Sequence, residues 1–177
     1  MQHETNIKKI TITDVDLNFT TITKKKWFPV DLKNEIEKSN FLILPNEFMT
    51  EDSNVFFPET TTDFYDYIRE KSNNDIVCDI AVTDENYQKL EKHSAIIEVA
   101  TFIVGSVVLP IAINMVSSFL YELTTKYRRK PKDTSAKVKI ISEKNNKKSS
   151  VMIEYEGPVE GIKEALEKAV EDIDGRD

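Results

Sequence analysis

The stretch VATFIVGSVVLPIAINMVSSFLY, residues 99–121, holds no charged residue in a 177-residue chain of which 31% is charged. As one helix, rising about 1.5 Å per residue, it would be roughly 35 Å long, enough to cross a hydrocarbon core of about 30 Å. Pro110 and Asn114 near its middle make insertion into lipid only marginally favourable. The sequence therefore leaves two interpretations open: a helix in lipid, or a helix buried in a core or subunit interface.

Small and polar residues recur every three or four positions along this run and would form one narrow stripe on a helix. In lipid the stripe would be a seam for close helix packing. In water it would be the face that a buried helix shows to solvent or to a polar partner. Proline removes a backbone donor, so a kink is expected at Pro110 in either setting. The residues predicted to contact a membrane or a partner are Ser106, Pro110, Asn114, Ser117 and Tyr121.

Four basic residues follow the run closely: Lys126, Arg128, Arg129 and Lys130. Beside an apolar helix they are typical of a contact with anionic lipid, and they would also favour the end of the helix dipole. The positive-inside tendency puts this end of the run in the cytoplasm. The N-terminus lacks the layout of a secretory signal. We therefore expect a cytoplasmic protein, with the run either at the inner face of the cell membrane or outside lipid.

The net charge of −7 is unevenly distributed. Residues 1–98 contain 11 basic and 19 acidic side chains, whereas residues 122–149 contain 10 and 3. This segregation suits a charged protein partner, a second copy of the chain or an anionic membrane, and nucleic-acid binding would need a broader basic face. The single Cys78 excludes a disulfide within one chain, and its apolar neighbours predict an inert thiol in a reducing compartment.

The hydrophobic pattern predicts an α+β fold in three units. The first unit, 1–93, is a small α/β layer, the second, 94–130, is the apolar helix with its basic end, and the third, 131–177, is a β-hairpin followed by an amphipathic helix.

Within the first unit we expect a strand over 10–20 with a bulge or turn near Asp14, followed by alternating helices and strands over 30–93. Asp31 is the expected cap of one helix, and Thr61 or Thr62 of the next. The last of these helices covers 84–93, with Tyr87 and Leu90 facing inward.

No motif for catalysis stands out. None of the four glycines forms a phosphate-binding loop, and His3 and His93 are far apart in the sequence, which predicts solvated or capping roles. Asp79 and Asp84, near a strand end, could belong to a carboxylate metal site, although a solvated acidic face is the commoner meaning of such residues. The sequence thus identifies no catalytic residue, no metal ligand set and no cofactor, and predicts a non-enzymatic protein.

The C-terminal half combines an apolar helix that ends in YRRKPK (127–132), the strands AKVKIIS (136–142) and SVMIEYE (150–156), and the helix EGIKEALEKAV (160–170). This layout resembles the small effector-associated constant components of bacterial conflict systems. The resemblance implies an accessory protein of an anti-phage or related defence locus that supports a separate effector.

We therefore expect an interaction or assembly component that uses its apolar helix for membrane association or oligomerisation and presents an acidic N-terminal layer to a partner. Three alternatives remain. The first is a soluble α/β protein whose apolar helix is core or subunit interface. The second is a pore-forming effector that lines its polar stripes around water. The third is an enzyme with a carboxylate metal site.

Overall fold

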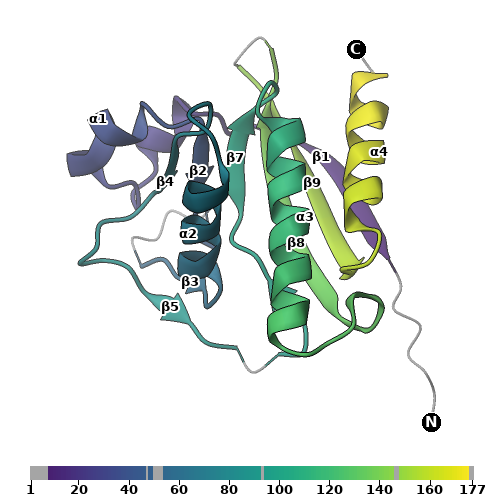
Figure 1. Cartoon of the computed structure of the whole chain (residues 1–177). Helices are drawn as coiled ribbons and strands as arrows, with labels where there is room; N and C mark the ends of the chain where they lie inside the picture. Colours follow the sequence, from purple (N-terminus) through teal and green to yellow (C-terminus); the bar gives the residue numbers. More distant parts are fainter. Residues whose placement is uncertain (1–7, 47, 50–53, 93, 146–147, 176–177) are drawn as a thin grey trace.

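The computed structural model describes residues 8–46, 48–49, 54–92, 94–145 and 148–175 (Figure 1). His3 and His93 lie outside these residues, so their predicted roles are not addressed. In chain order the elements are β1 (Lys9–Val15), η1 (Thr21–Lys24), η2 (Val30–Leu32), α1 (Lys33–Ile36), β2 (Phe41–Ile43), β3 (Phe57–Pro58), α2 (Thr61–Lys71), β4 (Cys78–Ile80), β5 (Lys89–Leu90), β6 (Ile97–Glu98), β7 (Phe102–Gly105), α3 (Leu109–Lys126), η3 (Pro131–Asp133), β8 (Ser135–Glu143), β9 (Ser150–Pro158) and α4 (Ile162–Asp174).

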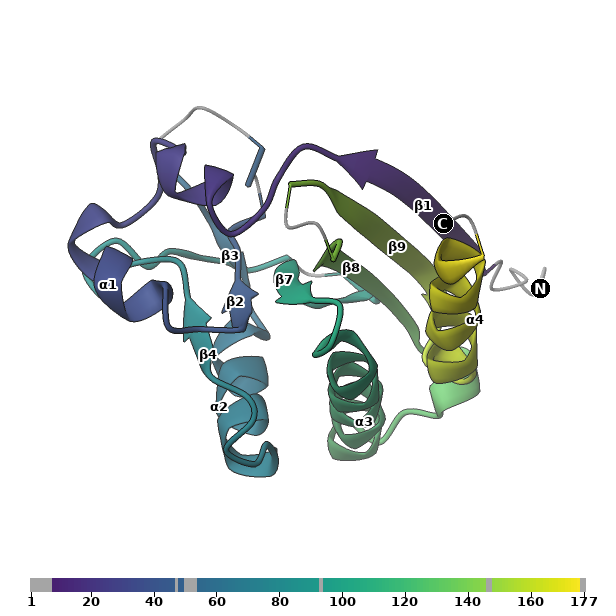
Figure 2. The same cartoon turned by 90° about the horizontal axis from the view of Figure 1, so that it is seen from above.

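Within these ranges one mixed sheet has the order β1-β9-β8-β7-β2-β4, and β6 also pairs with β8. The pairs β1/β9, β8/β9 and β2/β7 are antiparallel, whereas β7/β8 and β2/β4 are parallel. Helices α2, α3 and α4 lie on one face of the sheet (Figure 2). The α+β class is confirmed, and each of the three predicted units contributes strands to this sheet.

The predicted helix over 99–121 is wrong in its first third. Residues Phe102–Gly105 form β7, an interior strand between β8 and β2, and α3 begins only at Leu109. Pro110 therefore lies in the first turn of the helix, where its missing N–H would have no intrahelical acceptor anyway. Instead of producing the expected kink, Pro110 helps to start the helix. None of the helices in the described part of the chain has the length and apolar character to span a bilayer.

Helix α3 buries one face against the sheet and the neighbouring helices. The buried apolar residues on it are Leu109, Ala112, Ile113, Val116, Phe119, Leu120 and Leu123. Four aromatic rings join this helix to the strands and to α2. Phe41 stacks on Phe102 with 4.5 Å between centroids, and Phe64 lies 5.0 Å from Phe119. Because aromatic side chains bury large areas, this cluster supplies much of the core.

The hairpin β8/β9 and the amphipathic helix α4 are confirmed, as is a helix near 61–71. The helix over 84–93 is wrong. In its place are a turn and the two-residue strand β5, and the Tyr87 ring stacks on Phe57 at 5.3 Å. The strand predicted over 10–20 ends at Val15, and a bend follows at Asp16. A bulge near Asp14 is wrong, since β1 pairs with β9 in unbroken register.

The predicted helix caps are wrong as well. Leu32 precedes α1 and Thr60 precedes α2, neither with a side-chain cap. The Thr61 hydroxyl instead donates to the Pro58 carbonyl at 2.7 Å.

Candidate functional site

A groove of about 700 Å³ opens beside β4, between the η2–α1 segment, α2 and the chain that follows β4. We call it the acidic groove. Its lining residues are Asp31, Leu32, Glu35, Thr62, Tyr65, Asp66, Asp79, Ile80, Val82, Thr83, Asp84, Glu85 and Tyr87. Of these described lining residues, six carry carboxylates and none is a lysine or arginine. Carboxylates gathered around one concavity focus a negative potential there.

Three elements bring these side chains together. Helix α2 buries Phe64 and Ile68 against the core. Tyr65 and Asp66 lie on another side of this helix and line the groove. Strand β4 runs parallel to β2, so the chain leaves both strands at the same end of the sheet. The residues that follow β4 form the far wall of the groove.

Asp79 is the half-buried carboxylate of the groove. Its Oδ1 accepts a hydrogen bond from the Ile80 backbone N–H at 2.8 Å. Burial raises the pKa of Asp79 above its ordinary value, and the nearby charge of Glu35 raises it further. The Ile80 hydrogen bond and Arg69 only partly oppose these effects. Asp79 is therefore held in surroundings that disfavour its ionised form, a property common at functional sites.

The hydrogen bond from the Ile80 N–H to Asp79 also occupies the outer edge of β4 at Ile80. The Ala81 N–H donates to the Ile43 carbonyl at 2.9 Å, which points Ala81 toward β2. Because successive residues of a strand point their N–H groups in opposite directions, the Ile80 N–H faces away from the sheet. It is satisfied by Asp79, and the Ile80 carbonyl accepts from Val82 N–H at 2.8 Å. A further strand cannot use these groups without displacing both contacts.

Tyrosines form part of the groove wall. The Arg69 guanidinium carbon lies 5.3 Å from the centre of the Tyr65 ring, and burial raises the pKa of Tyr65. The Thr62 hydroxyl lies 3.4 Å from the Tyr87 hydroxyl. Ring faces next to carboxylates are suited to cations, because each attracts positive charge. Burial also raises the pKa of the neighbouring Cys78 thiol, which keeps it un-ionised.

Asp79 and Asp84, singled out from the sequence, both line the groove. Across the described ranges, no three His, Cys, Asp or Glu residues come close enough together to hold a metal ion. The sequence did not mark Glu35 or Glu85 as site residues. The available signal was the density of acidic residues in Thr83-Asp84-Glu85, directly after a buried strand.

The predicted polar stripe does not form one continuous face. Pro110, Asn114 and Tyr121 are exposed along α3, as expected for the face that a buried helix shows to solvent. Ser117 is buried instead, and its hydroxyl donates to the Ile113 carbonyl at 2.7 Å. Ser106 lies in the turn before the helix and donates to the Asn145 side chain at 2.8 Å.

The predicted basic cluster, Lys126, Arg128, Arg129 and Lys130, is exposed at the C-terminal end of α3. Lys126 pairs with Asp63 of α2 at 4.0 Å. Arg129 lies over the Tyr127 ring and donates to the Ala95 carbonyl at 3.4 Å. The cluster therefore also joins neighbouring parts of the fold, and its predicted contact with anionic lipid stays a prediction.

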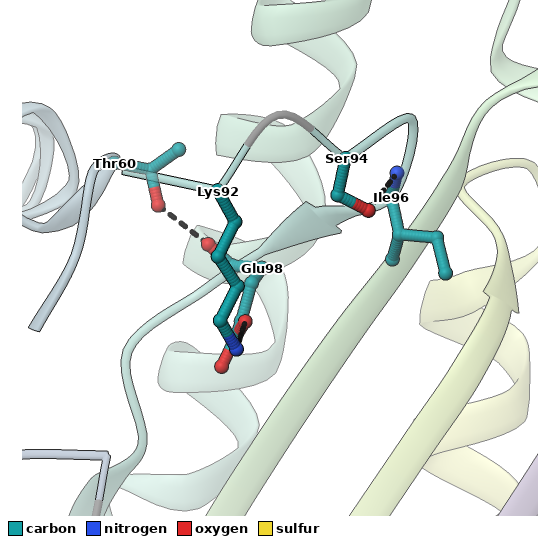
Figure 3. Close-up of polar contacts among 5 residues, drawn as sticks. All are labelled: Thr60, Lys92, Ser94, Ile96 and Glu98. Carbon is teal, nitrogen blue, oxygen red and sulfur yellow. Dashed lines mark hydrogen bonds and ion pairs between the residues drawn. The ribbon is translucent and has the colours of Figure 1, made fainter. Parts of the chain in front are cut away.

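A second, smaller cavity of about 180 Å³ differs from the groove in its charge balance. Figure 3 shows part of its wall, where Lys92 pairs with the Glu98 carboxylate at 3.5 Å. Thr60, which is not one of the lining residues, donates to the Glu98 carbonyl at 2.6 Å. The Ser94 hydroxyl accepts from the Ile96 N–H at 3.1 Å (Figure 3). These polar groups satisfy one another. The acidic groove, with its unbalanced charge, is the stronger candidate site.

Comparison with known proteins gives no further guide to function, because no protein family, no curated protein and no solved structure matches the chain.

Proposed function

We propose that this protein is a non-catalytic interaction component whose acidic groove receives a lysine- or arginine-rich segment of a protein partner. The observation that carries the proposal is the gathering of six carboxylates around a cavity of about 700 Å³, with no lysine or arginine among the described residues that line it. At Asp79, burial and the nearby charge of Glu35 oppose ionisation and raise the pKa of this carboxyl. Groups whose surroundings disfavour their charged form are common at functional sites.

The chemistry of the groove fits extended basic side chains. A guanidinium group can make paired hydrogen bonds to a carboxylate, and its planar face can lie on an aromatic ring such as that of Tyr87. The cavity volume of about 700 Å³ accommodates more than one such side chain. A single small cation would use only part of this space.

Catalysis by a carboxylate metal site is the competing proposal, and the described residues give it less support. Asp79 and Asp84 share the groove, yet no set of three donors forms there among them. An interaction role requires only the summed negative charge and the aromatic surface. If the layout resemblance to conflict-system accessory proteins reflects kinship, the partner would be a separate effector of a defence locus.

The test is binding of a fluorescent peptide of alternating arginine and glycine to the full chain at low salt. Asp66→Asn and Glu85→Gln should each weaken binding about two- to fivefold, since each removes one partly exposed charge contact. Asp172→Asn on the exposed side of α4 removes the same charge far from the groove and is the matched control. It should weaken binding less than either groove variant, because the Coulomb energy falls with distance.

Equal weakening by all three variants would show a general charge effect and contradict the groove. So would undetectable binding of the arginine peptide at low salt. A calorimetric titration with Mg²⁺ or Mn²⁺ separates the two proposals. Tight, stoichiometric metal binding that Asp79→Asn abolishes would favour the metal site instead.

A further inference from the structure

Strand β1 ends the sheet on the side opposite β4, and among the described residues it pairs only with β9. It is seven residues long, whereas β4 has three. Lys9, Ile10, Thr13 and Asp14 are exposed, and Ile10 keeps 37% of its surface in contact with solvent. Helix α4 packs against β1 and β9 and does not hydrogen-bond to the β1 backbone in the described part of the chain.

The hydrogen-bonding pattern shows which β1 groups face outward. The Lys144 N–H donates to the Ser149 carbonyl and the Val159 N–H donates to the Thr134 carbonyl, so odd-numbered residues of β9 point toward β8. Even-numbered residues of β9 then point toward β1, and they are paired with odd-numbered β1 residues. The N–H and C=O groups of Lys8, Ile10, Ile12 and Asp14 consequently face the open edge.

This edge lacks two of the usual features that prevent strand addition. The sequence Lys9–Val15, KITITDV, contains no proline, and its register with β9 has no bulge. Charges stand only at the two ends, with Lys8 and Lys9 before the central residues and Asp14 and Asp16 after them. An antiparallel second copy would bring each basic end opposite an acidic end.

We propose that β1 pairs with β1 of a second copy of this chain, antiparallel and with Thr11 on the twofold axis, to form a continuous sheet across two protomers. This register places Ile10 opposite the partner's Ile12, and Lys8 opposite the partner's Asp14. Opposing residues lie on the same face of both sheets, and the outward groups of one strand meet those of the other. The dimer goes beyond the groove proposal, because it uses the opposite edge of the sheet.

Cysteine cross-linking tests the register. Two strands meet at Thr11 in a non-hydrogen-bonded pair, with about 4.5 Å between Cα atoms, which suits a disulfide. The full chain carrying Thr11→Cys should form a disulfide-linked dimer under mild oxidation. Thr13→Cys is the matched control on the same strand face, because its two copies would be roughly 13 Å apart. The unmodified chain measures any background from Cys78.

Charge exchange tests the pairing without cysteines. Asp14→Lys should raise the dimer dissociation constant at least about tenfold in sedimentation experiments, because it creates like charges at both ends of the interface. Adding Lys8→Asp to this variant should bring the dimer dissociation constant back to within about threefold of the value for the unmodified chain. Asp14 is almost fully exposed and its ion pair with Lys144 is a surface contact, so the fold should tolerate the change.

A monomeric unmodified chain at millimolar concentration, or equal disulfide yields for Thr11→Cys and Thr13→Cys, would overturn the dimer. Peptide binding in the acidic groove is measured separately on the same variants. Failure of the dimer therefore leaves the groove proposal intact, and the reverse also holds.

Discussion

The two edges of the sheet end in opposite ways. At β4 the edge strand is short, and its outward N–H and C=O at Ile80 are used by Asp79 and Val82. At β1 a seven-residue strand has no described backbone partner on its outer side. Strand addition at the β4 edge is therefore opposed at Ile80, and a partner there is expected to use side chains in the acidic groove, whereas a partner at the β1 edge can be recognised by backbone pairing.

The largest expected effect concerns the core that connects the two edges. Phe64 is fully buried and contacts the rings of Phe41, Phe102 and Phe119. Phe64→Ala should lower the free energy of unfolding by about 3–5 kcal/mol, measured by urea denaturation with circular dichroism. The exposed Tyr127→Ala is the control and should change it by less than about 1 kcal/mol. A small loss at Phe64 would contradict its place in a tightly packed aromatic cluster.

Proline substitution probes the direction of the β1 groups. Thr13→Pro removes an N–H that faces β9 and leaves a partner acceptor unsatisfied, at a cost of about 1–3 kcal/mol. Asp14→Pro removes an N–H that faces the open edge, so its cost should be clearly smaller. Both residues are exposed, which makes them a matched pair for thermal denaturation of dilute protein. A larger loss of stability for Asp14→Pro than for Thr13→Pro would contradict the assignment of which β1 N–H groups face β9.

A substitution at Gly157 tests how closely β9 approaches the backbone at the start of β1. A Cβ added at Gly157 would lie 3.0 Å from the Lys8 Cα and 3.1 Å from the Tyr155 hydroxyl, whereas one at Gly105 would meet open space. Gly157→Ala should lower the free energy of unfolding by about 1–2 kcal/mol, because the backbone at Lys8 must shift. Gly105→Ala, also in a strand of this sheet, should change the free energy of unfolding by less than about 0.5 kcal/mol in the same urea denaturation assay.

The smallest effect is expected at the closed edge and depends on pH. The pKa of Asp79 is raised in the fold, so the folded state binds this proton more tightly than the unfolded chain. The stability that the protonated form supplies is complete below the ordinary value of 3.8 and is lost as pH rises through the raised pKa.

Asp79→Asn keeps an acceptor for the Ile80 N–H and removes the charge. The variant should therefore have the higher Tm at about pH 7, and the difference should disappear near pH 3. A lower Tm for the variant at neutral pH would contradict this account of the groove. The same substitution should weaken binding of the arginine peptide.

Local pattern was enough to predict α2, the β8/β9 hairpin and α4, because each has its own periodicity and boundaries. It failed at residues 99–121. An interior strand such as β7 is apolar on both faces and does not differ in hydropathy from a buried helix. The Gly105-Ser106 pair and Pro110 were the available signals of a turn and a helix start.

The candidate site could be predicted only in part. Asp79 and Asp84 drew attention as carboxylates near a strand end, whereas Asp31 and Glu35 reach the groove through the packing of another segment. The pairing of β1 with β9 joins the two ends of the chain, and local periodicity does not encode such long-range neighbours. The open edge was therefore not visible in the sequence.

Amide hydrogen exchange at increasing protein concentration tests the difference between the edges most directly. The account predicts that the Ile80 amide and the β9-facing amides of Thr11 and Thr13 are protected at every concentration. The outward amides of Ile10 and Ile12 should exchange rapidly in dilute protein and become protected as the chain dimerises. Outward amides that stay unprotected up to millimolar concentration, or an Ile80 amide that exchanges as fast as Ile12 in dilute protein, would contradict it.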